Sequence, residues 1–166
     1  MKFTALSLGI IFLLIVGWLA FGGKLGPKKQ VHYHAGFVVF ENNEKLDFSD
    51  FKYMHYMPCV DDQREKESPK DNQIEKAHLH DNIGDVVHVH REGAKWRDLF
   101  INLNFPIDYA KSKGYIEGEE VGDFENKKIE PYESIVIFIG QNDMTNLNEA
   151  PAKDHIIKVE EKSDGC

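Results

Sequence analysis

Residues 78–90 read HLHDNIGDVVHVH, and polar and apolar side chains alternate on both sides of the central Asn-Ile-Gly. This alternation around a turn signal predicts a β-hairpin. A three-residue loop at 82–84 would require a left-handed conformation at Gly84. Residues that pair across the two strands would then both have even numbers or both have odd numbers. The four histidines, all even-numbered, would share one face, and the apolar residues between them would enter the core. A loop of even length would divide the histidines between two faces.

Histidine pairs of the form His-x-His account for six of the eight histidines in the chain. The pairs are His32 and His34, His78 and His80, and His88 and His90. Random placement would give on the order of 0.4 such pairs, so their clustering indicates a shared purpose. On a strand, residues i and i+2 face the same way and lie about 6.5–7 Å apart, so two imidazoles can converge on one ion. We therefore predict that the three pairs are metal ligands.

The first pair begins a second strand candidate. Residues 32–40 read HYHAGFVVF, a run of β-branched and aromatic residues typical of strands. Asn42 and Asn43 then predict a turn into residues 45–48, which makes a second hairpin. If this hairpin lies beside the first, six imidazoles line one surface.

Two further ligand candidates are Cys59 and Asp81. In residues 53–59 (YMHYMPC), His55, Met57 and Cys59 would face one way in an extended segment, although Pro58 excludes a central strand. Thioether, thiolate and imidazole together favour Cu(I), whereas imidazole with a carboxylate or one thiolate suits Zn²⁺ or Cu(II). Asp81 is either a carboxylate ligand or a group that orients the ring of its neighbour His80. The expected cofactor is therefore a copper or zinc ion.

Other interpretations of these side chains stay open at this point. The histidines could instead form a proton-sensing cluster that becomes charged between about pH 5 and 7. Met54 and Met57 could be core residues that fill gaps. Cys59 could be inert, or could form a disulfide with Cys166 in an oxidising compartment.

The N-terminal segment predicts a membrane anchor. Residues 5–23 contain no charged side chain, and this length just spans a hydrocarbon core of about 30 Å. We expect a transmembrane signal anchor at 1–23 and a linker at 24–30, with cleavage after Gly22 as the alternative. Three lysines that follow the anchor favour a cytoplasmic domain. The short, signal-like N-terminus favours export instead, so we place the domain outside the cytoplasm of a single-pass membrane protein.

The charge distribution excludes nucleic acid as a partner. The formal net charge is −8, and no acidic residue precedes Glu41 although four lysines do, so the region after the linker is more acidic still. Such a surface repels phosphates, and no basic stripe offsets it. It would raise the local concentration of cations, although acidic surfaces also serve ordinary solubility. The expected partners are a metal ion and the membrane, and the sequence identifies no protein partner.

The order of elements predicts an α+β domain at 31–144 followed by a C-terminal helix and tail at 145–166. Residues 61–76 are mostly polar and predict a solvated loop. Residues 96–103 carry an apolar helical stripe, and Pro106 limits this helix. Gly114 would end a possible continuation from Asp108 to Lys113. Residues 134–140 (SIVIFIG) are typical of a buried central strand. We expect a mainly antiparallel sheet with one helix packed across it, a β-grasp-like arrangement.

The pattern of His-x-His at a strand start, then His78-Leu79-His80-Asp81, then 84–90 (GDVVHVH) and a helix with Arg97-Asp98-Leu99-Phe100 resembles a group of small membrane-anchored or exported domains of bacteria and archaea. The resemblance covers roughly residues 31–140. No activity is established for the group, so the resemblance implies an extracytoplasmic location and little else.

These observations favour a membrane-tethered, extracytoplasmic protein that captures, buffers or transfers copper or zinc. A metalloenzyme, either an oxidoreductase or a hydrolase, is the first alternative. It would need a metal-bound water and a base such as Glu92, Asp85 or Asp81. No recognisable catalytic motif names a reaction. A module whose assembly depends on pH or metal is the second alternative.

Overall fold

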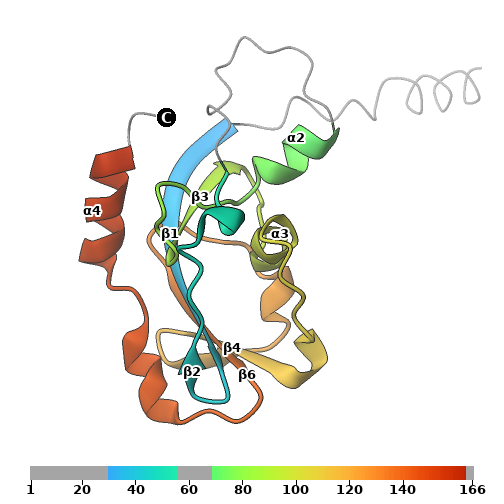
Figure 1. Ribbon diagram of the computed structural model, residues 1–166, viewed down its shortest axis with the longest axis vertical. Coiled ribbons are helices and arrows are strands. Elements are labelled where there is room, and N and C mark those ends of the chain that lie inside the picture. The colour runs from blue at the N-terminus through green and yellow to red at the C-terminus, as the bar shows by residue number, and fades with distance from the viewer. Residues whose placement is uncertain (1–29, 56–68, 164–166) are drawn as a thin grey trace, which may run out of the picture.

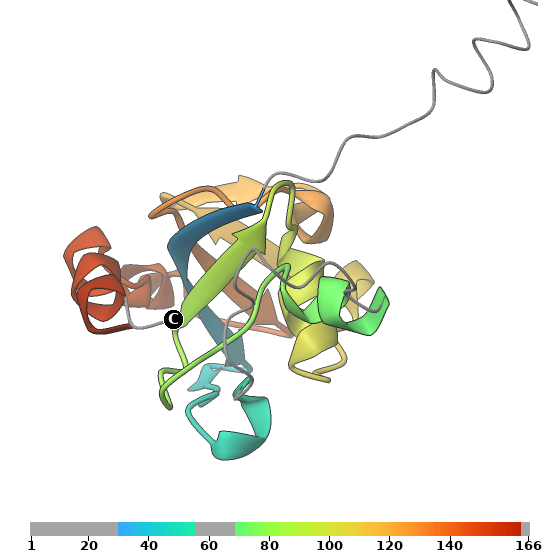
Figure 2. The same ribbon diagram turned by 90° about the horizontal axis from the view of Figure 1, so that it is seen from above.

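The computed structural model describes residues 30–55 and 69–163, which form a six-stranded sheet with helices on both faces (Figures 1 and 2). The strands are β1 (Gln30–Glu41), β2 (Glu44–Lys45), β3 (Val86–Arg91), β4 (Ser112–Ile116), β5 (Glu119–Val121) and β6 (Ser134–Ile139). The α-helices are α2 (Pro69–Ile74), α3 (Trp96–Asn102) and α4 (Lys153–Ser163). Short 3₁₀ helices are η1 (Phe51–Tyr53), η2 (Tyr109–Lys111), η3 (Phe124–Asn126) and η4 (Met144–Glu149).

The sheet is mixed. Its order is β2-β1-β6-β4-β5, and β3 pairs with β1 outside this path. The central strands β1 and β6 run parallel, whereas the other pairs are antiparallel. The α+β prediction is confirmed, and four of the five strand pairings in the described residues are antiparallel as expected, whereas the parallel β1–β6 pair makes the sheet mixed. The expectation of one packed helix is corrected, because α3 and α4 pack on different faces of the sheet. A continuous apolar strand such as β6, buried among its neighbours, is typical of parallel pairing.

The hairpin of β1 and β2 forms as the sequence predicts. Phe40 lies opposite Lys45, and the two residues between the strands, Asn42 and Asn43, have φ angles of 51° and 71°. Asparagine tolerates this left-handed conformation, which lets a tight two-residue turn follow the twist of the strands.

The 78–90 region keeps the predicted register but forms only part of the predicted hairpin. His78 lies opposite His88, the pairing that a three-residue loop at 82–84 requires. However, the expected left-handed residue is not Gly84: Asp81 and Asn82 have the positive φ angles. Gly84 is needed for a different reason, because a Cβ there would lie 2.6 Å from the main-chain carbon of Phe48. The turn is thus packed against the segment that follows β2.

The two faces of the sheet have different covers. Odd-numbered residues of β1, among them Phe37 and Val39, join α3 in the main core. Even-numbered residues point to the opposite face. There, Val38 and Phe40 pack with β6 and residues near η4, and α4 buries Ile156 and Val159. Figure 2 shows α4 and α3 on opposite sides of β1 and β3. Because His32 and His34 are even-numbered, they lie on the face that α4 covers.

Two further sequence predictions can be compared with the structure. The apolar run at 134–140 is the buried strand β6, as predicted. The helix from Trp96 ends at Asn102, before Pro106 as predicted, and the possible continuation from Asp108 to Lys113 does not form because η2 and β4 occupy that stretch. Gly114 does not end a helix: a Cβ on Gly114 would lie 2.5 Å from the Phe124 ring, so the glycine lets η3 pack on β4.

Several predictions concern residues outside the described ranges. These are the anchor at 1–23, most of the linker at 24–30, Met57, Cys59 and Cys166. Gln30, the last residue of the predicted linker, already belongs to β1. In the described part of the chain, no helix has the length and apolar character needed to cross a membrane.

Candidate metal centre

Three adjacent segments bring their histidine pairs to one face of the sheet. His34 of β1 pairs with His88 of β3. His78 pairs with the same His88 across the other edge of β3. The pair on β3 is therefore flanked by the other two pairs. Ring centroids across the strands are 4.1 Å apart for His34–His88, 4.6 Å for His80–His88, 4.7 Å for His32–His90 and 5.1 Å for His78–His90. The six imidazoles form one continuous array, as equal parity predicts.

His32, His34 and His88 can hold a metal ion together. Each offers a ring nitrogen, and these three atoms lie within 4.8 Å of one another. His34 Nε2 and His88 Nδ1 are 3.0 Å apart. Two nitrogens bound at about 2.0–2.1 Å to a tetrahedral ion lie about 3.4 Å apart, so this pair needs only a small adjustment. A ring nitrogen of His32 lies within 4.8 Å of both, which makes His32 the third candidate ligand.

Burial keeps most of the array neutral. His34 and His88 are 0% and 1% exposed, whereas His32 is exposed to solvent. Desolvation, followed by the neighbouring imidazoles, holds the pKa of His88 far below its usual value and lowers the pKa of His90 to about 3. Burial likewise lowers the pKa values of His78 and His80. Neutral imidazole is the form that binds metals, so these rings are ready as ligands near pH 7.

Helix α4 supplies a carboxylate behind His34. Glu160 Oε1 lies 3.5 Å from His34 Nδ1, and the Tyr132 hydroxyl donates a 2.7 Å hydrogen bond to Glu160 Oε2. Ser163 Oγ lies 3.5 Å from His34 Nε2. A carboxylate near the distal ring nitrogen of a ligating histidine fixes the ring and makes it more basic. Glu160 is therefore positioned to support His34 as a ligand through Nε2.

Replacing Glu160 with glutamine should weaken zinc binding by about 10–100-fold, because the amide would no longer polarise the His34 ring. Competition with a chromophoric chelator measures this affinity. Glu161→Gln is the matched control, since Glu161 is the exposed neighbour on the same helix. Equal affinities in the two variants would remove Glu160 from the site.

The remaining sequence candidates have different positions. His55 joins the array, with its ring centroid 5.0 Å from that of His78. Asp81 is exposed, and its charge opposes the lowering of the His80 pKa without overcoming burial. Cys59 lies outside the described residues. Asp85, a candidate base in the enzyme hypothesis, instead lies 3.0 Å from His155 of α4, and both side chains are partly exposed.

Sequence reasoning missed the contribution of the C-terminal segment. Glu160, Ser163 and Tyr132 lie far along the chain from the histidine pairs, and none belongs to a motif. The available signal was the spacing of Ile156 and Val159, which places the apolar side of a short helix against the sheet. It would have placed Glu160 near that side without identifying its partner.

No protein-family model, curated protein or solved structure is significantly similar to the chain. The resemblance of residues 31–140 to small exported or membrane-anchored domains stays a prediction. The functional conclusion depends on the chemistry and geometry of the histidine array.

Proposed function

We propose that this protein is a membrane-tethered, extracytoplasmic metal-binding protein that captures, buffers or transfers copper or zinc. The observation that carries the proposal is the convergence of His32, His34 and His88, whose ring nitrogens lie within 4.8 Å of one another although they come from strands distant in sequence. Imidazole is a suitable ligand for both Zn²⁺ and Cu(II).

The burial of polar rings supports a ligand role. Burying a polar group is costly unless it is hydrogen-bonded, and these rings find partners largely in one another, as in the His34–His88 and His78–His80 contacts. His34, His78, His88 and His90 are each less than 5% exposed. A bound cation would satisfy several ring nitrogens at once, which gives the arrangement a physical purpose.

The exposure of His32 supports exchange rather than a purely structural ion. In the triad of His32, His34 and His88, the His32 side chain faces solvent, while the other two lie beneath it. An incoming ion can therefore meet His32 first and reach the buried ligands next, and a departing ion can follow the reverse path. The acidic character of the chain would raise the cation concentration nearby.

The cellular placement in this proposal comes from the apolar residues 5–23 and the signal-like N-terminus. The strand order β2-β1-β6-β4-β5, with α3 against one face, supports the β-grasp-like arrangement expected from the sequence, to which α4 adds a cover on the other face.

Metal content of the full chain tests the proposal. The protein would be purified in detergent, stripped with chelator, incubated with Zn²⁺ or Cu²⁺, and desalted before elemental analysis. We expect at least stoichiometric metal that survives desalting. Metal below a tenth of an equivalent for both ions, in a protein whose circular dichroism shows a folded domain, would refute the proposed function.

A further inference from the structure

A second group of imidazoles lies beside the triad. His78 Nε2 and His80 Nε2 are 3.0 Å apart, and both residues are buried. The ring centroid of His55 lies 5.0 Å from that of His78 and 6.2 Å from that of His80. These three side chains come from two neighbouring segments, because Met54 pairs with Leu79 and His55 N donates a 2.8 Å hydrogen bond to the Leu79 carbonyl.

The orientation of His78 is fixed from behind. His78 Nδ1 lies 2.9 Å from the carbonyl oxygen of Ile74. A carbonyl oxygen only accepts, so Nδ1 carries the hydrogen and Nε2 keeps its lone pair toward His80. A backbone carbonyl that binds the distal nitrogen is the usual support of a metal-ligating histidine.

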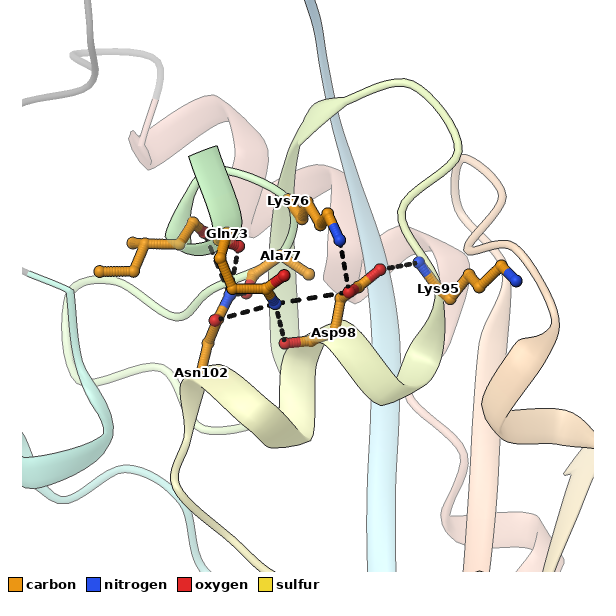
Figure 3. A network of polar contacts seen from close by, with 7 residues as sticks. Gln73, Lys76, Ala77, Lys95, Asp98 and Asn102 are labelled. Carbon is orange, nitrogen blue, oxygen red and sulfur yellow. Dashed lines mark hydrogen bonds and ion pairs between the residues drawn. The ribbon is translucent and has the colours of Figure 1, made fainter. Parts of the chain in front are cut away.

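The main chain that leads into His78 is held by α3 (Figure 3). The side-chain amide of Asn102 donates hydrogen bonds to the carbonyl oxygens of Gln73 and Ala77, at 3.0 and 2.6 Å. Asp98, like Asn102, belongs to α3, and its carboxylate lies 2.8 Å from Lys76 Nζ. Ligands that are locked by packing and hydrogen bonds make a precise site, and this clamp gives the His78 and His80 segment such support.

We propose that His78 and His80, with the His55 side chain turned toward them as a third ligand, hold a second transition-metal ion beside the one held by His32, His34 and His88. In the described part of the chain only His32, His34 and His88 already bring three ligand atoms within 4.8 Å of one another, so His55 has to turn when the second ion binds. This inference rests on the proposed function. The nitrogen spacing of His78 and His80 matches that of His34 and His88, so both pairs are equally close to the separation of about 3.4 Å that a tetrahedral ion requires. The His80 and His88 rings, 4.6 Å apart between centroids, lie between the two positions. The array therefore holds a pair of neighbouring ions.

Stoichiometry in matched variants tests this inference. The full chain in detergent would be titrated with Zn²⁺ and analysed after desalting, as the wild type and as H32Q/H34Q, H78Q/H80Q and H155Q. We expect two ions per chain in the wild type and in H155Q, and one ion in each double variant. With Cu²⁺, the wild type should give a half-field EPR signal, which only closely spaced ions produce, and both double variants should lose it.

The outcomes separate the two proposals. One ion per chain in the wild type, or two ions retained by H78Q/H80Q, would overturn the second position and leave the proposed function standing. No bound metal in the wild type would overturn both. If H78Q/H80Q fails to fold by circular dichroism, the half-buried His55→Gln replaces it. That variant should bind the second Zn²⁺ at least tenfold more weakly, and unchanged binding of both ions would overturn the assignment.

Discussion

Replacing His88 with glutamine should weaken zinc binding at the triad by about a hundredfold or more. His88 is the candidate ligand from β3. Its Nδ1 lies 3.0 Å from His34 Nε2, and in the described part of the chain only His32, His34 and His88 place three potential ligand atoms within 4.8 Å of one another. Structural zinc sites bind with about 10–16 kcal/mol over four ligands, so each ligand accounts for roughly 3 kcal/mol, or two orders of magnitude.

His155→Gln is the control for this prediction. His155 lies on α4 and interacts with Asp85, and it is the one histidine without a ring contact to the array among the described residues. Its replacement should leave zinc affinity unchanged, as measured by competition with a chelator of known affinity. Comparable losses in the two variants would mean that zinc binds to surface histidines in general, and the triad would lose its assignment.

Acidification should destabilise the metal-free protein steeply below about pH 6.5. The buried imidazoles have lowered pKa values in the folded state, about 3 for His90, whereas the unfolded chain takes up protons near pH 6.5. Between these values the unfolded state binds more protons, so the free energy of unfolding falls as the pH falls. When the pH falls from 7.5 to 5.5, each imidazole that stays neutral in the folded state should lower the free energy of unfolding by about 1 kcal/mol. The four buried imidazoles with lowered pKa values should together lower it by about 3–5 kcal/mol.

Urea unfolding of the full chain at pH 7.5 and pH 5.5 measures this dependence. A loss of this size is a large part of the total stability of an ordinary domain. In H88Q/H90Q two of the titrating groups are gone, so the difference between the two pH values should shrink by about 2 kcal/mol. Zinc should raise the urea concentration at the unfolding midpoint more at pH 7.5 than at pH 5.5, because protons compete with zinc for the ring nitrogens. A wild-type stability that is flat across this range would show that the rings are not held neutral.

Local periodicity made the histidine face predictable. Alternation in residues 78–90 fixes which side chains share a face, and the observed pairing of His78 with His88 keeps that parity. The same reasoning identified β1, its Asn42-Asn43 turn and the apolar strand β6. In each case the signal lies within a few residues of the element that it predicts.

Long-range packing was not predictable in this way. Nothing in the local sequence specifies that β1 and β6 pair in parallel, or that α4 returns to place Glu160 beside His34. The polar residues 61–76 predicted a loop, yet residues 69–74 form α2, whose last carbonyl orients His78. Short polar helices depend on tertiary contacts such as those with Asn102, so propensity alone does not reveal them.

X-ray absorption at the metal edge of the zinc-loaded full chain tests the central claim most directly, because it reports the atoms bound to the ion. Imidazole ligands give a characteristic multiple-scattering pattern beyond a first shell of nitrogen at about 2.0 Å. We expect about three imidazoles per zinc in the wild type. A first shell of oxygen ligands without imidazole scattering would contradict the assignment of the histidine array as a metal centre.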